Sequence, residues 1–209
     1  MTGIGTGVGK TLCSAVVTEA LQADYWKPIQ SGLDEATDSE TVASLISNPR
    51  TRIWPEAYRL QTPASPHLAA RIDNVRIGLQ ELKAQFRSRY SQDRYIVVEG
   101  AGGLLVPLNE TDFFPDLIRE LEARVIVVSS QYLGNINHSM MTAEVLRQRG
   151  LPVLGWIFNG TYHVNEEDII RWSGLPKLGR IEQEEELNPA VVSRYAEKLR
   201  PALLEALGH

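Results

Sequence analysis

A glycine-rich run at residues 2–11, Thr-Gly-Ile-Gly-Thr-Gly-Val-Gly-Lys-Thr, constrains the fold of this chain more than any other stretch. Glycine has no Cβ and tolerates positive φ, so successive backbone N–H groups can turn inward around an anion. Lys10 would then place a positive charge on the terminal phosphates of a nucleotide, and the Thr11 hydroxyl could bind Mg²⁺. A flexible glycine-rich terminus is the alternative, but apolar residues at helical spacing follow directly. We therefore predict a phosphate-binding loop that leads into a helix, whose positive dipole end points at the phosphates.

The segment before this loop is short. Only Met1 and Thr2 precede Gly3, whereas a buried strand normally leads into such a loop. We therefore expect a truncated first strand, either because strand residues are missing or because the start is set late. The glycine spacing is also unusual, since the strict pattern G-x-x-x-x-G-K-[ST] would place its first glycine at the position of Ile4. This spacing predicts a longer loop than the usual one.

Composition limits the class of protein. With 209 residues, 43% of them apolar and 22% charged, the chain is expected to form one globular domain over residues 1–209. A net charge of -5 without a block of Lys or Arg gives no electrostatic support for nucleic-acid binding. The one cysteine, Cys13, excludes a disulfide framework and a Cys-rich metal cluster. Because no apolar run reaches the length of a membrane span and no leader is visible, we expect no membrane association and a cytoplasmic location.

Predicted buried strands alternate with predicted helices along the chain. Three runs rich in Val and Ile, at residues 95–98, 125–128 and 153–158, lack the polar/apolar alternation of a half-exposed strand. Such strands are typical of a parallel sheet that is covered on both faces. We therefore predict an α/β fold, with a doubly wound and mainly parallel sheet flanked by helices in three α/β/α layers.

Polar side chains follow several of these strands, at the sheet edge where α/β proteins bind ligands. Pro28 biases Lys27 toward extended backbone and indicates that a strand ends here, although a solvated surface lysine is the alternative. Glu99 ends the buried run at residues 95–98 and could bind Mg²⁺ directly or through water. Asn159 follows another buried run, and its amide could present both a donor and an acceptor to a nucleotide base.

Asp38 has two interpretations. It precedes a helical pattern, where Asp38 or Ser39 would be a sound N-cap. Taken alone, we would favour the cap. Beside the phosphate loop and Glu99, we favour a metal ligand.

Together these motifs resemble those of dethiobiotin synthetases, which are P-loop NTPases. Four strings support this: K-P-x-x-S-G at residues 27–32, S-P-H at 65–67, V-V-E-G-A-G-G at 97–103 and L-G-x-I-N-H at 133–138. The longer phosphate loop is similar to the variant of this family, and the ordered motifs extend over essentially the whole chain. The chain departs from the family at Ile4 and Gly5, usually Thr-Asp, and in the acidic run at residues 182–186.

The resemblance implies the ATP-dependent carboxylation of 7,8-diaminopelargonic acid with CO₂ and closure of the ureido ring to dethiobiotin, a ligase step of biotin biosynthesis. ATP would be the co-substrate and Mg²⁺ the metal. The resemblance implies catalytic roles for Lys10, Lys27 and Thr6, and Mg²⁺ binding by Thr11, Asp38 and Glu99. Nucleotide contacts are implied for Gly7, Val8, Gly9, Lys10, Thr11, Asn159 and Glu182. Substrate contacts are implied for Thr6, Lys27, Ser31, Gly102, Gly134, Asn135, Ile136 and Asn137.

The resemblance also implies a homodimer in which residues 134–137 reach the substrate carboxylate in the neighbouring subunit. That these residues only cap their own helix is an alternative that stays open. Two other functions are alternatives: a ParA/MinD-like switch ATPase and a cobyrinate-type amide synthetase. The switch ATPases carry a second lysine where this chain has Gly5. The amide synthetases normally have an added glutaminase domain, for which 209 residues leave no room.

Overall fold

Parallel strands form the centre of the structure, a computed structural model that describes residues 1–161 and 165–209. Four strands pair in the order β1-β7-β8-β9, over Thr2–Gly3, Val125–Ser130, Val153–Asn159 and Lys177–Ile181. Three more pair in the order β4-β2-β6, over Ile53–Trp54, Asp24–Trp26 and Ile96–Val98. A short pair is formed by β3 (Ile29–Ser31) and β5 (Tyr58–Leu60). All of these pairs are parallel, as the sequence predicts for the main sheet.

Met1 connects the two larger groups of strands. Its terminal ammonium donates to the Val98 carbonyl at 2.7 Å, and the Gly100 N–H donates to the Met1 carbonyl at 2.9 Å. On its other side β1 pairs with β7, where Thr2 lies opposite Val127. The strand that leads into the phosphate loop therefore lies between β6 and β7. Because the strands are parallel, the loops that follow them meet at one edge of the sheet.

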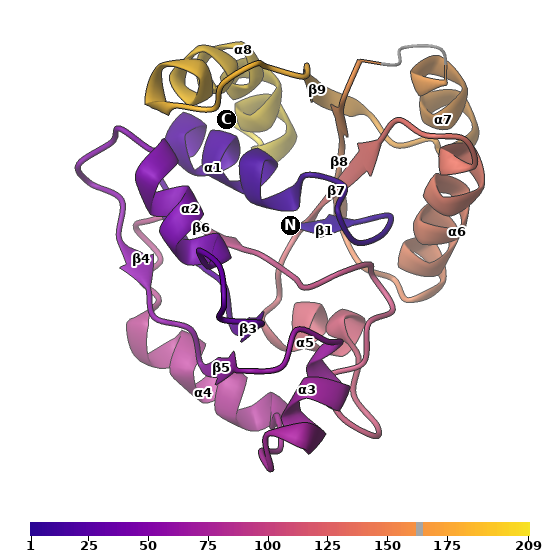
Figure 1. The fold of residues 1–209 in the computed structure, drawn as a ribbon. Helices are drawn as coiled ribbons and strands as arrows, with labels where there is room; N and C mark the ends of the chain where they lie inside the picture. The colour runs from indigo at the N-terminus through magenta and orange to yellow at the C-terminus, as the bar shows by residue number, and fades with distance from the viewer. Residues whose placement is uncertain (162–164) are drawn as a thin grey trace.

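Helices lie on both sides of the strands, as Figure 1 shows. On one side, α1 (Lys10–Leu21), α2 (Asp38–Leu45) and α8 (Pro189–Leu207) contact one another. Across the strands, α6 (Asn135–Gln148) packs against α7 (Glu166–Ser173). In the lower part of Figure 1, α4 (Leu79–Arg89) packs against α5 (Phe114–Glu120), and α3 (Pro66–Ile72) contacts β3 and β5. Within residues 1–161 and 165–209, no helix is both long and apolar enough to cross a membrane.

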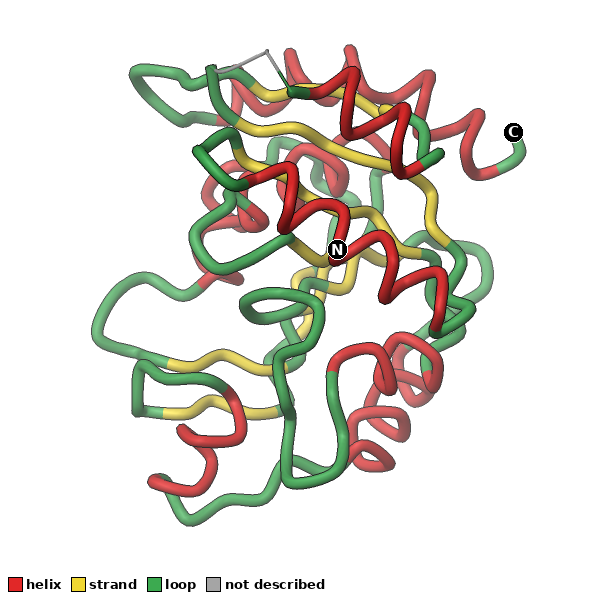
Figure 2. Tube along the Cα trace, turned by 90° about the vertical axis from the view of Figure 1, so that its right-hand side faces the viewer, coloured by secondary structure: helices red, strands yellow, loops and turns green. Residues whose placement is uncertain are grey.

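The strands in the middle of the molecule are buried, and Figure 2 shows them side by side with helices packed around them. In β7, Val127 and Val128 are 0% exposed, and Ile157 and Phe158 are 0% exposed in β8. Neighbouring residues of a strand point to opposite faces, so both faces of these strands are covered. This explains why the sequence shows apolar runs without alternation.

The start of α2 shows which residue caps this helix. Thr37 is the N-cap: its hydroxyl accepts a hydrogen bond from the Glu40 N–H at 3.2 Å, and the Glu40 carboxylate accepts one from the Thr37 N–H at 2.8 Å. The alternative that Asp38 or Ser39 caps this helix, which we did not favour for Asp38, is therefore wrong, because the reciprocal Thr37–Glu40 pair already caps it. The Asp38 carboxylate is left for partners outside the helix.

Candidate active site

The loop between β1 and α1 has the backbone that a phosphate-binding loop requires. Gly7 and Gly9 have φ of 72° and 87°, a left-handed conformation that other residues rarely adopt. A Cβ on Gly9 would lie 2.0 Å from Asn159 Nδ2, and a Cβ on Gly3 would lie 2.6 Å from Val8 Cγ2. Gly9 is also the N-cap of α1, so the positive end of this helix faces the loop. The close contacts around Gly3 and Gly9, and the positive φ of Gly7 and Gly9, therefore explain why glycine occupies these positions.

Lys10 is the first residue of α1 and is only 7% exposed. Its ammonium donates a hydrogen bond to the Gly5 carbonyl at 3.0 Å. Burial, and next the charge of Lys27, lower the pKa of Lys10 below its ordinary value. An anion placed near both lysines would offset the desolvation and the repulsion that cause this shift.

Thr11, Lys27, Asp38 and Glu99, here called the ion cluster, meet beside this loop. The Lys27 ammonium lies 2.6 Å from Asp38 Oδ2 and 3.2 Å from Glu99 Oε1. The Thr11 hydroxyl lies 2.6 Å from Asp38 Oδ1 and 3.1 Å from Glu99 Oε1. With one proton, this hydroxyl can donate to only one carboxylate at a time. The structure thus brings together the three residues expected to bind metal, and it adds Lys27 to them.

The charges of the ion cluster compensate one another. Burial alone would lower the pKa of Lys27, but Glu99 and Asp38 raise it above its ordinary value. Burial alone would raise the pKa of Asp38, but Lys27 lowers it below its ordinary value. Lys27 and Asp38 are therefore both ionised at neutral pH.

Tyr25 belongs to this site and is not marked by any motif in the sequence. It is 0% exposed in β2, and its hydroxyl donates to Glu99 Oε2 at 2.9 Å. Burial, and next the charge of Glu99, raise the pKa of Tyr25 well above its ordinary value, so the hydroxyl keeps its proton. The signal that could have found Tyr25 is its two-residue spacing from Lys27, which places both on the same face of an extended strand.

Three residues expected to contact the substrate lie at the end of β3 and on two loops: Ser31, Thr6 and Gly102. The Ser31 hydroxyl oxygen is buried and has no hydrogen-bond partner in the part of the chain that the structure describes. Gly102 has φ of 62°, and a Cβ on it would lie 3.3 Å from the Thr6 hydroxyl oxygen. Thr6 itself is exposed. The loop after β6 therefore packs closely against the phosphate loop.

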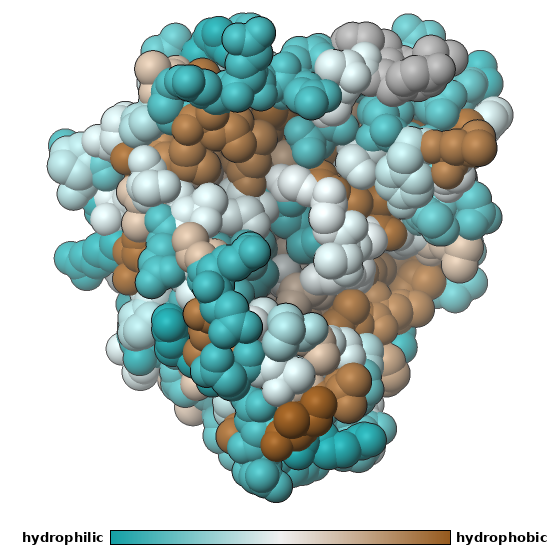
Figure 3. Space-filling view, in the orientation of Figure 1, coloured by the Kyte–Doolittle hydropathy of each residue, from teal (hydrophilic) through white to brown (hydrophobic). Residues whose placement is uncertain are grey.

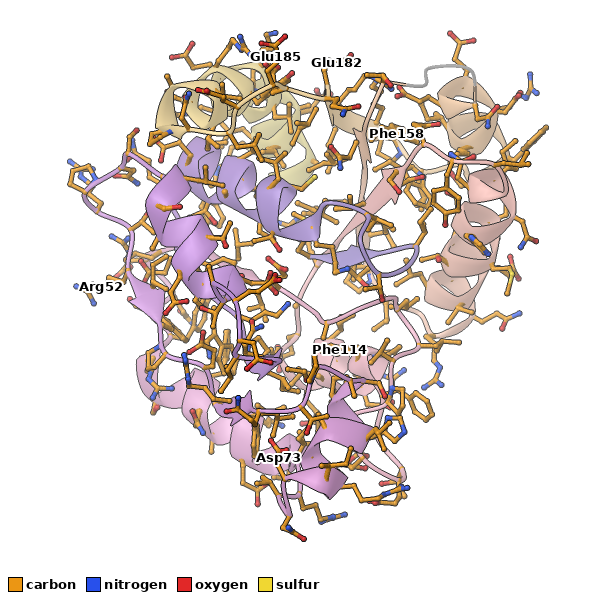
Figure 4. All side chains as sticks on the ribbon, viewed as in Figure 1. Arg52, Asp73, Phe114, Phe158, Glu182 and Glu185 are labelled. Atoms are coloured by element: carbon orange, nitrogen blue, oxygen red, sulfur yellow. The ribbon has the colours of Figure 1, made fainter. Side chains whose placement is uncertain are left out.

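Asn159 and Glu182 follow neighbouring strands at the same sheet edge. Asn159 is the last residue of β8, and its side-chain amide donates to the Val8 carbonyl at 3.1 Å. Glu182 comes directly after β9, which pairs with β8, and its carboxylate accepts from Arg180 Nε at 2.7 Å. Figure 4 shows Glu182 and Phe158 of β8 in the same upper part of the molecule. Asn159 therefore contacts the phosphate loop, and Glu182 lies one strand further along the edge.

A cavity elsewhere in the molecule is separate from these groups. Its volume is about 650 Å³, and its lining includes Met1, Val97 and Ile126. Its lining includes all of β6 and the first two residues of β7, and none of the four ion-cluster residues. The phosphate loop and the ion cluster lie at the C-terminal edge of the sheet, so this cavity is not part of their site.

Known proteins of similar sequence identify the family. A family described as an AAA domain matches residues 1–191. A protein of Christiangramia forsetii named ATP-dependent dethiobiotin synthetase BioD is 47% identical over 206 residues, which cover 98% of this chain and 97% of that protein. A protein of the same name from Cytophaga hutchinsonii is 46% identical over 200 residues, which cover 95% of each. The chain belongs to the dethiobiotin synthetase family.

Solved structures show the wider fold that this dethiobiotin synthetase family shares. A ParA family ATPase from Chlorobium tepidum is 14% identical, with a TM-score of 0.59 over 99% of this chain and 96% of that one. The MinD cell division protein of Aquifex aeolicus is 13% identical, with a TM-score of 0.60 over 100% of this chain and 95% of that one. At such identities the likeness shows the fold alone, and it confirms the predicted three-layer P-loop arrangement.

The segment that the dethiobiotin synthetase resemblance assigns to the substrate carboxylate begins α6. Gly134 has φ of 101° and is the N-cap, and no side chain in residues 1–161 or 165–209 caps this helix. Asn135 is buried: its amide donates to Gln131 Oε1 at 3.0 Å, and its side-chain carbonyl accepts from Asn165 Nδ2 at 3.1 Å. Asn135 is therefore held by partners within its own chain.

Exposed apolar side chains surround this segment. Ile136 is partly buried against the core and Asn137 is exposed, while Leu133 and Met141 are 103% and 59% exposed. Figure 3 shows brown, apolar atoms at the surface near the start of α6. Over residues 1–161 and 165–209, no hydrogen bond or ion pair joins residues 134–137 to the ion cluster. No such contact therefore connects residues 134–137 to the ion cluster within this chain, over the residues that the structure describes.

Proposed function

We propose that this chain catalyses the ATP-dependent carboxylation and ring closure of 7,8-diaminopelargonic acid with CO₂, which yields dethiobiotin, ADP and phosphate. The observation that carries the proposal is the ion cluster beside a phosphate loop, in a chain that matches a dethiobiotin synthetase over 98% of its length. The fold alone would not support it, because ParA and MinD ATPases have the same fold.

The proposed reaction has three steps. One amine of the substrate adds to CO₂ and loses a proton, which gives a carbamate. A carbamate oxygen attacks the γ-phosphorus of ATP, the bond from that phosphorus to the ADP oxygen breaks, and a carbamic-phosphoric anhydride forms. The second amine attacks the carbonyl carbon, which closes the ureido ring and releases phosphate. The protein contributes mainly positioning and charge stabilisation to such a reaction.

Lys10 and Lys27 supply the positive charge in this proposal. Both ammonium groups are buried beside the phosphate loop, where a charge acts more strongly than in water. They neutralise the charge that develops on the transferring phosphoryl group. Thr6 and Ser31 hold the carbamate with Gly102 beside them. The Ser31 hydroxyl, which has no hydrogen-bond partner among the described residues, supports this role. A buried polar atom without a partner in the free protein is available to a ligand.

We infer that Mg²⁺ binds at Thr11, Asp38 and Glu99. The Thr11 hydroxyl lies within 3.1 Å of an oxygen from each carboxylate, and hydroxyl and carboxylate oxygens suit this hard cation. Residues 1–161 and 165–209 contain no group of three or more His, Cys, Asp or Glu placed to hold a metal. Phosphate and water oxygens would therefore complete the coordination, as is usual for Mg²⁺. When bound, the metal neutralises charge on the β- and γ-phosphates.

The nucleotide lies along the phosphate loop in this proposal. The N–H groups of Gly7, Val8 and Gly9 surround the phosphates. The Asn159 amide, at the end of β8, forms hydrogen bonds with the nucleotide base. The contact of Asn159 with Val8 supports a place beside the nucleotide. Glu182, in the segment after β9, contacts the nucleotide on the side away from the phosphate loop.

We further propose a homodimer with shared active sites. The lysines and the metal site account for ATP and the carbamate, but they leave the distant carboxylate of the substrate without a partner. Gly134, Asn135, Ile136 and Asn137 offer N–H groups and the positive end of α6, which favour an anion. Exposed Leu133 and Met141 beside them form an apolar surface that a second copy would cover. Each subunit would then complete the other's site.

The function is tested by the substrates that ATP consumption requires. ADP release should depend on both diaminopelargonate and bicarbonate, and mass spectrometry should detect dethiobiotin in equal amount. A switch ATPase would hydrolyse ATP without either compound, and a cobyrinate-type synthetase would need an acid to amidate. ADP release that ignores diaminopelargonate would contradict the proposal.

A further inference from the structure

Glu99 accepts hydrogen bonds on both of its carboxylate oxygens. Oε1 lies 3.1 Å from the Thr11 hydroxyl and 3.2 Å from the Lys27 ammonium. Oε2 lies 2.9 Å from the Tyr25 hydroxyl. Glu99 is 1% exposed, so bulk water does not reach this carboxylate, and its orientation depends on Tyr25, Lys27 and the Thr11 hydroxyl, whose one proton Asp38 also attracts.

Tyr25 and Lys27 reach Glu99 from the same strand end. Tyr25 lies in β2 and Lys27 directly follows the last residue of this strand, Trp26, so the two side chains point to the same face of the extended chain. β2 and β6 pair in parallel, with Tyr25 opposite Val97, and the Glu99 N–H donates to the Trp26 carbonyl at 2.9 Å. The backbone register therefore fixes the phenol and the carboxylate relative to each other.

Packing explains the ring of Tyr25 but not its hydroxyl. The ring lies in the core cluster that also contains Val16 of α1 and Val42 of α2. Phenylalanine would fill the same space. In the described part of the chain, the Tyr25 hydroxyl donates to Oε2 of Glu99. Oε1 of the same carboxylate then faces Thr11 and Lys27.

We propose that Tyr25 is a positioning residue of the active site. Its hydroxyl holds Oε2 of Glu99, so that Oε1 stays directed at Thr11 and Lys27, beside which Mg²⁺ and the phosphates of ATP would bind. This inference rests on the proposed role of Glu99 as a metal ligand. Groups that orient a ligating carboxylate typically change metal affinity or activity about 10- to 100-fold when they are removed.

The substitution Tyr25→Phe tests this, because it keeps the ring and removes only the hydroxyl. Calorimetry measures binding of the non-hydrolysable analogue AMP-PNP, once with Mg²⁺ and once with EDTA. The gain in affinity that Mg²⁺ provides should fall about 10-fold, while affinity in EDTA stays that of the wild type. Tyr58→Phe is the matched control: its hydroxyl accepts from the Gly78 N–H at 3.0 Å, and its loss should leave both affinities unchanged.

A double-mutant cycle distinguishes positioning from a merely structural role. Because Tyr25 acts through Glu99, Tyr25→Phe combined with Glu99→Gln should lose no more Mg²⁺-dependent affinity than Glu99→Gln alone. Circular dichroism and thermal unfolding confirm that each variant is folded. Additive losses, or a normal Mg²⁺ gain in Tyr25→Phe while Glu99→Gln is defective, would overturn the role of Tyr25 and leave the metal site standing. A normal Mg²⁺ gain in Glu99→Gln would instead overturn the metal site, and the role of Tyr25 with it.

Discussion

The Lys27 ammonium and the Asp38 carboxylate form an ion pair of 2.6 Å that joins the segment after β2 to the first turn of α2. The same ammonium lies 3.2 Å from Glu99 Oε1, so one cation serves both carboxylates that we propose as metal ligands. A divalent cation entering between these oxygens would compete with Lys27 for them.

Lys10→Ala should leave the fold intact and remove most of the turnover. Removing one positioned donor from such a site costs about 3–4 kcal/mol, or roughly 10²- to 10³-fold in kcat. Steady-state ADP release measures the loss, and circular dichroism checks the fold. Lys83→Ala on α4, where the lysine pairs with Glu120, is the control and should keep the wild-type rate. A folded Lys10→Ala variant with near-wild-type turnover would contradict the catalytic role of Lys10.

Asp38→Asn should raise the Mg²⁺ concentration needed for half-maximal activity, because an amide oxygen is a weaker ligand than a carboxylate. We expect a shift of at least about 10-fold, measured by titrating Mg²⁺ at saturating ATP. Asp93→Asn, in an exposed loop, should show the wild-type requirement. A nucleotide-bound structure with both Asp38 and Glu99 remote from the phosphates would refute the metal site.

The ion pair also predicts how stability depends on pH. The pKa of Asp38 is lowered from 3.8 on folding, so its contribution is complete above that value and is lost as the pH falls through the folded pKa. The pKa of Lys27 is raised from 10.5, so its contribution is complete below that value and is lost only at more alkaline pH. Urea unfolding should therefore show a constant stability difference between wild type and Asp38→Asn from about pH 6 to 9, which shrinks below about pH 4. The same difference at pH 7 and pH 3 would contradict this.

Local sequence signals predict most of the fold. The apolar runs at residues 125–128 and 153–158 lie in β7 and β8, and the glycine-rich run lies in the loop before α1. No sequence signal marks β4 and β5, because these two- and three-residue strands lie outside any longer run of apolar residues such as the one that contains β6. A strand is predictable from sequence where burial on both faces requires a run of apolar residues, and short edge strands lack such a run.

The site is predictable only where a motif fixes the chemistry. Lys10 and Thr11 follow from the phosphate loop, whereas the cap at Thr37 depends on which of several polar residues meets the free N–H groups. The role of Tyr25 depends on the register between β2 and β6, which no single stretch of sequence encodes. A cytoplasmic location, and the lack of nucleic-acid or membrane partners, stay predictions.

Shared active sites can be tested by mixing two inactive chains. One chain carries Lys10→Ala and the other carries a lesion at residues 134–137. The structure selects Asn137→Ala for the second chain, because Asn137 is exposed. Asn135 is the poorer choice, since it is buried and holds Gln131 and Asn165 in its own subunit, so its loss would also disturb the local fold.

In a heterodimer of these chains, one site carries both lesions and the other carries neither, provided that each site takes residues 134–137 from its neighbour. Random exchange of equal amounts should then restore about a quarter of the wild-type activity, because half of the dimers are mixed and half of their sites are intact. If instead each subunit uses its own residues 134–137, every site keeps one lesion and no activity returns. Exchange is verified independently with subunits of different mass. Inactive mixtures with proven exchange would therefore rule out shared sites, while the Lys10 and Mg²⁺ predictions, which concern one subunit, would stand.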